Sequence, residues 1–234
     1  MISPVLPLEA FAKNNNEKVN FYLLMSRFIG SKTQLSKRVG RNLFLKGARS
    51  FSAKDDYSKK PQKPGVHGGG KSFAKISEYS KQLTEKQALR FTYGLTEKQL
   101  ANTFKRAFKA KDETGYGLFS LLERRLDNVV YRAGLANSRA QARQLVNHGH
   151  FLLNGIRASI PSMLVSAADK IEVKPAKAKN AFWTNFQLEV PNEQSAWLSK
   201  KDRTINVINE PTADDLPKEF NPGYIIEYYS RRVN

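Results

Sequence analysis

Arginine and amide side chains are concentrated in residues 138–157, SRAQARQLVNHGHFLLNGIR. Ser138 and Gln141 have the spacing of a helix capping box, so we expect a helix to begin after Ser138. Arg139 would then lie in the first helical turn, where the helix dipole favours an anion and disfavours a cation. Backbone N–H groups at that end, together with Arg139 and Arg143, make a natural phosphate site. The segment is therefore predicted to bind a phosphate backbone, and an arginine exposed by chance is the alternative.

A β-hairpin is predicted directly after this helix. Gly149 is the expected helix stop. Phe151-Leu152-Leu153 and Ile156-Arg157-Ala158 are expected to form two short strands around Asn154-Gly155, the signature of a two-residue type I′ turn. A third short strand is expected over residues 170–173.

Helices are predicted upstream to position this segment. Apolar residues recur every three to four positions over residues 118–133, which predicts one continuous helix that ends at Gly134. A second helix is expected over residues 96–110. For the helix before it, Ser77 and Thr84 are both candidate N-caps.

Two further apolar segments are expected to pack on the rest of the protein. Residues 224–229, YIIEYY, are β-prone and too aromatic for a free tail, so we expect them to dock on the body of the protein. Phe44 is expected to pack in a core, with stacking on a nucleobase as the alternative.

The charge distribution favours a polyanionic partner. The 234 residues carry a net charge of +18, and residues 26–111 alone hold 21 basic and 5 acidic side chains. Residues 180–234 hold 6 basic and 8 acidic side chains, so the C-terminal segment is not a basic arm. A surplus of this size is typical of proteins that bind nucleic acid. A merely basic soluble protein is the alternative.

Several function classes lack support in the sequence. The chain has no cysteine and only three histidines, which excludes disulfides and thiolate metal sites. No apolar run approaches the roughly 18 residues of a membrane span. No nucleophile–base or paired-carboxylate arrangement is recognisable, so we expect no hydrolase or metal chemistry.

Two short motifs are weighed against their context. Residues 65–72, GVHGGGKS, match the P-loop pattern, but Pro61 and Pro64 exclude the buried strand that must precede a P-loop. Arg125-Leu126-Asp127 is similar to a signature around the catalytic aspartate of pseudouridine synthases. Because it lies within a predicted helix, we expect Asp127 to be a surface residue or a capping partner.

Taken together, four segments resemble the S-four family of small-subunit ribosomal proteins. They are RNLFLKG at 41–47, GVHGGGKSFAKISEYSKQLTEKQALRFTYGLTEKQL at 65–100, LLERRLDNVVYRAGLANSRAQARQLVNHGHFLLNGIRASIPS at 121–162 and EYYSR at 227–231. The last resembles the terminal strand of the family. The resemblance runs from about Ser26 to the C-terminus.

The resemblance implies an α+β fold. It consists of a helical domain, an inserted RNA-binding module of two helices and a small β-sheet (the alpha-L motif), and a flexible basic N-terminal segment. The implied boundaries are an atypical extension over 1–25, the basic segment over 26–72, a helical domain over 73–118 completed by 180–234, and the module over 119–179.

The resemblance also implies a function without enzymatic activity, cofactor or membrane partner. The protein would be a structural constituent of the small ribosomal subunit in the cytoplasm. Its partners would be small-subunit ribosomal RNA, bound at a junction in the 5′ domain, the third and fifth small-subunit proteins, and mRNA near its entry path. It would nucleate subunit assembly and contribute to translational accuracy.

The residues expected to contact RNA are basic or polar side chains of the N-terminal segment, the helical domain and the module. They are Lys32, Lys37, Arg38, Arg41, Lys46, Arg49, Lys71, Lys75, Lys81, Lys86, Arg90, Arg125, Arg132, Ser138, Arg139, Gln141, Arg143, His148, Asn154 and Arg157.

Two departures from the family and two rival functions remain. Many relatives carry zinc-binding cysteines near the start, and their absence here means that zinc is not expected. The first 24 residues have no recognised family counterpart. An RNA-modifying enzyme would need a catalytic domain that residues 180–234 are too few to form. A stress-type binder of stalled large subunits is the other alternative.

Overall fold

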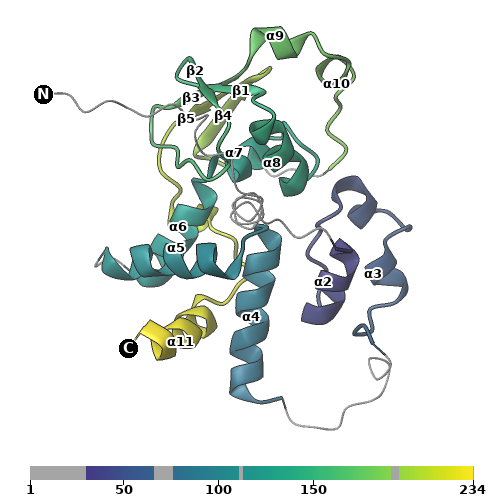
Figure 1. Ribbon diagram of the computed structural model, residues 1–234, viewed down its shortest axis with the longest axis vertical. Coiled ribbons are helices and arrows are strands. Elements are labelled where there is room, and N and C mark those ends of the chain that lie inside the picture. Colours follow the sequence, from purple (N-terminus) through teal and green to yellow (C-terminus); the bar gives the residue numbers. More distant parts are fainter. Residues whose placement is uncertain (1–29, 66–75, 111–112, 191–194, 234) are drawn as a thin grey trace, which may run out of the picture. The chain divides into compact units, whose positions relative to one another are not determined.

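The computed structural model describes residues 30–65, 76–110, 113–190 and 195–233 (Figure 1). Residues 31–234 form one compact unit. It is an α+β structure with helices and a five-stranded antiparallel sheet, which confirms the predicted fold class. Its apolar side chains form two separate cores, one in a helical part (α2–α6 and α11) and one in a module (α7–α10 and β1–β5).

The basic N-terminal segment is more regular than the sequence suggested. It forms α2 (Lys32–Val39), the 3₁₀ helix η2 (Gly47–Phe51) and α3 (Asp56–Lys59), and α2 packs on α4. The core expectation for Phe44 is wrong. Phe44 is 41% exposed, and its ring stacks on that of Phe51 at 4.8 Å between centroids, while neighbouring Leu43 is the buried residue.

Helices α4 (Glu78–Thr92) and α5 (Glu97–Lys109) begin at polar caps. The Ser77 hydroxyl accepts a hydrogen bond from the Ser80 N–H, so Ser77 and not Thr84 caps α4. Thr96 and Gln99 form a complete capping box at the start of α5, as the spacing predicts. Because Leu100, Phe104 and Ala107 share one buried face, α5 packs along α6.

The single helix expected over residues 118–133 is in fact two helices. Helix α6 (Thr114–Glu123) ends at Arg124, and α7 (Leu126–Arg132) begins after Arg125. The loop at 161–165 crosses this break, and carbonyl oxygens of Met163 and Pro161 accept hydrogen bonds from the first N–H groups of α7. Apolar periodicity continues through the break, which is why the sequence pattern does not reveal it.

The module packs α7 and α8 (Arg139–Asn147) on the sheet. The strands are β1 (Phe151–Leu153), β2 (Ile156–Ala158), β3 (Lys170–Val173), β4 (Leu198–Lys201) and β5 (Thr204–Val207), in the order β2-β1-β3-β5-β4. The predicted hairpin is confirmed, with positive φ at both Asn154 and Gly155.

Strands β4 and β5 were not predicted, and they place residues 195–207 in the module. Trp183, Trp197 and Ile205 lie in the module core. The module also contains α9 (Pro175–Ala178). The C-terminal segment, residues 180–234, therefore divides, since its first part, with α10 (Ala181–Thr184), β4 and β5, completes the module. Its later part packs on the helical part, whose core includes Leu216 and Phe220, and the Pro211 carbonyl already accepts a hydrogen bond from Tyr116 of α6.

The expected C-terminal β-strand is helix α11 (Pro222–Val233), yellow in Figure 1, which follows the 3₁₀ helix η3 (Ala213–Asp215). Pro222 at the start presets a helical φ. Ile225, Tyr228 and Tyr229 recur at helical spacing and are buried against the helical part. The prediction that this segment docks on the body is confirmed, since α11 packs against α4, α5 and α6.

Candidate nucleic-acid interface

Helix α8 begins as the sequence predicts, with one difference in the cap. The Ser138 hydroxyl accepts a hydrogen bond from the Gln141 N–H at 3.2 Å. The Gln141 side chain reaches one residue further back than in a capping box, and its Oε1 accepts from the Asn137 N–H at 2.7 Å. Ser138 and Gln141 thus fix the helix start, where Arg139 occupies the first turn.

Arg139 is held by aromatic rings and an amide. Its guanidinium carbon lies 5.0 Å from the ring centroid of Tyr93 and 4.6 Å from that of Tyr131. Its Nε donates a hydrogen bond to Asn128 Oδ1 at 2.8 Å. The alternative of an arginine exposed by chance is wrong, because Arg139 contacts two aromatic rings and donates a hydrogen bond within the protein.

Arg143, one helical turn later, also has partners inside the protein. Its NH1 donates to the Gly94 carbonyl at 3.4 Å and lies 3.5 Å from Asp127 Oδ2. Asp127 is 5% exposed and accepts two hydrogen bonds from Arg125, which is 6% exposed. Asp127 is therefore a buried ion-pair partner and not a surface residue. Its Oδ1 also accepts a hydrogen bond from the Asn128 N–H at 3.0 Å in the first turn of α7, which agrees with the alternative expectation of a capping partner.

A second buried carboxylate, Glu123, lies next to this pair. It accepts hydrogen bonds from Arg132 at 3.0 and 2.9 Å, from Asn128 at 2.7 Å and from the Tyr93 hydroxyl. Burial raises the pKa of Glu123, but the charges of Arg132 and Arg139 and these hydrogen bonds outweigh burial and hold it below its usual value. Burial and the Glu123 charge raise the pKa of Tyr93. These contacts favour the charged form of Glu123, which binds the side chain of Arg132 directly.

Two residues of α4 that were predicted to contact RNA, Lys86 and Arg90, form ion pairs within the protein. Lys86 is 2% exposed, pairs with Glu97 Oε2 at 2.8 Å and lies 4.6 Å from the Tyr228 ring centroid. Arg90 lies 3.5 Å from Glu97. For Lys86 and Arg125 the structure shows a buried structural role in place of the exposed contact that was expected.

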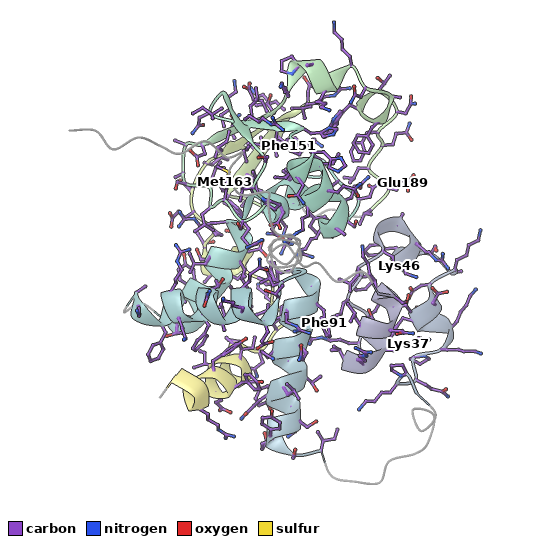
Figure 2. All side chains as sticks on the ribbon, in the orientation of Figure 1. Lys37, Lys46, Phe91, Phe151, Met163 and Glu189 are labelled. Atoms are coloured by element: carbon purple, nitrogen blue, oxygen red, sulfur yellow. The ribbon has the colours of Figure 1, made fainter. Side chains whose placement is uncertain are left out.

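The N-terminal segment presents its basic side chains at the surface. Lys46 and Arg49 pair with Asp56 at 2.9 and 3.2 Å, and their hydrogen bonds and charges lower the pKa of Asp56. Arg41 pairs with Glu85 at 3.3 Å. Lys37 and Lys46, labelled in Figure 2, lie on this segment together with half-buried Lys32 and exposed Arg38.

The remaining predicted RNA contacts, on the hairpin, at the end of α8 and on α4, are either exposed or hydrogen-bonded within the protein. Arg157 and His148 are exposed. Asn154 bonds Asp169 Oδ1 and the Lys170 N–H, both at 2.8 Å, so its side chain ties the hairpin turn to β3. Lys81, on α4, is exposed and pairs with Glu78 at 2.7 Å.

Some residues that matter to this surface were missed by the sequence analysis. Tyr93 and Tyr131 gave no signal, because aromatic residues near helix ends usually belong to cores. Asn128 gave a signal that was not used, since an amide on a predicted apolar helix needs a buried partner. Lys71, Lys75 and the glycine-rich motif lie outside the described residues.

The described residues contain no cluster of three or more side chains of the types that hold a metal ion. Within the same part of the chain, no helix is long and apolar enough to cross a membrane.

Two family models match consecutive stretches of the chain, which together span residues 27–171. A family model described as the ribosomal protein S4/S9 N-terminal domain matches residues 27–123, and one described as the S4 domain matches residues 124–171. The boundary between them falls at the break between α6 and α7.

Relatives named "Small ribosomal subunit protein uS4" are similar over their full length. Those of Syntrophomonas wolfei, Clostridioides difficile and Borreliella burgdorferi are 44%, 43% and 43% identical to this chain over 210, 209 and 213 residues. Each alignment covers 88 or 89% of this chain and 100% of the relative. These names describe ribosomal proteins and not enzymes, in agreement with the prediction. The chain belongs to the uS4 family of small ribosomal subunit proteins.

Proposed function

We propose that this protein is a structural constituent of the small ribosomal subunit and binds small-subunit ribosomal RNA. The observation that carries the proposal is the full-length similarity to relatives named as small ribosomal subunit proteins. The net charge of +18 supports it, because a polyanion is the partner that such a charge fits.

The RNA surface in this proposal consists of basic side chains that the structure leaves accessible. On the N-terminal segment these are Lys37, Arg38 and Arg49. On the module they are Arg157 of the hairpin and His148 at the end of α8. Phosphate contacts from these residues supply affinity. The shape of the folded RNA supplies specificity, since A-form helices expose little sequence information to side chains.

The finer parts of the proposal follow the family resemblance. They are binding at the 5′-domain junction, nucleation of subunit assembly, contact with the third and fifth small-subunit proteins, a place near the mRNA entry path and a contribution to translational accuracy. The continuous match of the chain to its relatives is their support.

The test is a binding titration against a 5′-domain fragment of small-subunit ribosomal RNA across a salt series, with tRNA as competitor. Tight, competitor-resistant binding with a steep salt dependence is expected. Binding that tRNA displaces, or sedimentation of the protein with large subunits, would overturn the proposal.

The same titration tests the proposed surface. Arg38→Gln and Arg157→Gln should each reduce the slope of log K against log salt by about 0.7 to 0.9, the value of one phosphate contact. Arg231→Gln, an exposed change on α11, is the matched control and should leave the slope unchanged. An unchanged slope in Arg38→Gln or Arg157→Gln would remove that residue from the surface.

A further inference from the structure

The contacts of Arg139 join the two parts of the unit. Tyr93 belongs to the core of the helical part, whereas Tyr131 packs against the core of the module. The guanidinium of Arg139 lies 5.0 Å from one ring centroid and 4.6 Å from the other. The described members of the two cores have no residue in common, so Arg139 lies where the cores meet.

These contacts form a closed ring. The Tyr93 hydroxyl donates to Glu123, and Asn128 Nδ2 donates to the other Glu123 oxygen at 2.7 Å. Asn128 Oδ1 accepts from Arg139, whose guanidinium lies against the ring of Tyr93. The residues come from the end of α4, the end of α6, α7 and the start of α8, so the ring fixes four helices together. We call Tyr93, Glu123, Asn128, Tyr131 and Arg139 the joint.

Burial makes the joint sensitive to the loss of any member. Glu123 is fully buried, and Tyr93 and Asn128 are 4% and 2% exposed. A buried polar group that loses its partner keeps its desolvation cost without compensation. The position of Arg139 in the first turn of α8 is also explained. The aromatic faces of Tyr93 and Tyr131 and the charge of Glu123 attract the guanidinium and offset the unfavourable helix dipole.

The contacts of Arg139 depend on the planar shape of its guanidinium group. A guanidinium can lie against aromatic rings while its edge donates a hydrogen bond, whereas a lysine ammonium is a compact charge without a flat face. A phosphate contact makes a weaker demand, since lysine also serves there. Arginine and lysine are therefore not equivalent in a joint, whereas a lysine retains a point-charge contact with a phosphate.

We propose that Arg139 is a positioning residue that fixes the module against the end of α4 and supports RNA binding through this joint, not through a phosphate contact of its own. Basic side chains lie on both sides of the joint, on the N-terminal segment and on the hairpin. A fixed joint lets both surfaces engage one RNA without a further ordering cost.

The joint itself is tested without RNA. The chain has no cysteine, so Lys105→Cys on α5 and Ala176→Cys on α9, both exposed, give unique sites for a spin-label pair. Arg139→Gln, Arg139→Lys and Tyr131→Leu should each broaden the distance distribution between the labels in the free protein. Tyr131→Leu loosens the joint without a change in charge, and Arg106→Gln on α5 is the control that should leave the distribution unchanged. An unchanged distribution in Arg139→Gln and Tyr131→Leu would overturn the proposal.

The second readout is RNA affinity, and only this arm rests on the proposed function. With the 5′-domain fragment, Arg139→Lys should bind about tenfold more weakly at an unchanged salt slope, since the charge remains and the joint is lost. Near-parental affinity of Arg139→Lys, or a salt slope in Arg139→Gln lower by about 0.7 to 0.9, would indicate a phosphate contact and overturn the proposal. If the parent protein does not bind this RNA, the proposed function fails, while the distance measurement still decides the joint.

Discussion

At the scale of single residues, two carboxylates organise the arginines of the module. Glu123 binds Arg132, and Asp127 binds Arg125 with Arg143 nearby. Because these carboxylates are buried, each arginine is bound where a sequence would suggest a solvent-exposed charge. A count of basic residues therefore overestimates the surface that is free for RNA. Only the contacts in the structure distinguish arginines bound to buried carboxylates from basic side chains that are exposed.

Gly47 is a residue whose lack of a side chain is required. It has φ of +59°, and a Cβ there would lie 2.5 Å from the carbonyl oxygen of Asn137, in the loop before α8. Gly47→Ala should lower the free energy of unfolding by about 2 to 4 kcal/mol, from backbone strain and overpacking together. Gly40→Ala is the matched control in a urea titration, because Gly40 has φ of +78° but open space around it. Equal losses in both variants would show that the contact with Asn137 carries no energy.

His150 makes stability depend on pH because its pKa is lower in the folded than in the unfolded protein. Its Nδ1 accepts from the Trp183 indole N–H at 2.8 Å, and burial, the Lys177 charge and His148 lower the pKa of His150. The unfolded chain therefore binds this proton more readily than the folded one. The stabilisation is complete above pH about 6.5, the ordinary histidine pKa, and is lost as the pH falls through the lowered pKa of the folded state.

Unfolding in urea at several pH values below 7 checks this prediction. The parent should lose stability as the pH falls, and His150→Gln, which retains an acceptor but does not titrate in this range, should lose less. Parallel curves for the two proteins would contradict the assignment to His150.

At the scale of elements, the tetrapeptide Thr-Glu-Lys-Gln occurs twice, at residues 84–87 and 96–99, and caps a helix only at the second place. Thr96 and Gln99 cap α5, whereas Thr84 and Gln87 have the same spacing inside α4. Thr96→Ala should cost about 1 kcal/mol of stability, because it leaves the first turn of α5 without its acceptor. Thr84→Ala should cost nothing or stabilise slightly, since alanine is the better helix former. Thermal unfolding of both variants measures the difference, and a larger loss for Thr84→Ala would refute this account.

Short-range patterns predicted those elements whose signals are local. The start of α5, the start of α8 and the hairpin at Asn154-Gly155 each depend on residues within four positions of one another. For the same reason their boundaries agree closely with the structure.

Elements decided by distant contacts were not predictable in this way. The break between α6 and α7 is stabilised by the loop at 161–165, about forty positions along the chain, and β5 exists as a strand because β3 and β4 lie beside it. The C-terminal residues 224–229 have β-prone side chains but pack as a helix on α4 and α5, so tertiary packing overrides local preference. The candidate site shows the same division, since the cap of α8 was predicted and the Tyr93 contact was not.

At the scale of the whole unit, two cores meet at one polar joint. The helical part is closed by α11, where Tyr229 stacks on Phe104 at 4.8 Å and donates to Glu97 Oε1 at 3.0 Å. Burial raises the pKa of Glu97, but Lys86, Tyr229 and Arg90 lower it by more than burial raises it. The net effect lowers the pKa and favours the charged form of Glu97 in this network. The module is closed in turn by β4 and β5 on its sheet. Each core therefore depends on chain segments that follow the module's first strands.

This arrangement predicts how the unit loses structure when one core is weakened. Tyr229→Ala should cost the helical part about 3 to 5 kcal/mol, because it removes an aromatic ring from a closely packed core. Ile205→Ala, at a fully buried position of β5, should cost the module about 2 to 5 kcal/mol. Amide hydrogen exchange at low denaturant should then show faster exchange in α4 and α5 for Tyr229→Ala, with β1 and β3 still protected, and the reverse for Ile205→Ala. Equal acceleration in both parts for both variants would mean that the joint couples the cores into a single cooperative unit. In that case Tyr131→Leu, which loosens the joint, should restore separate behaviour, because the joint is the connection through which one core would sense the other.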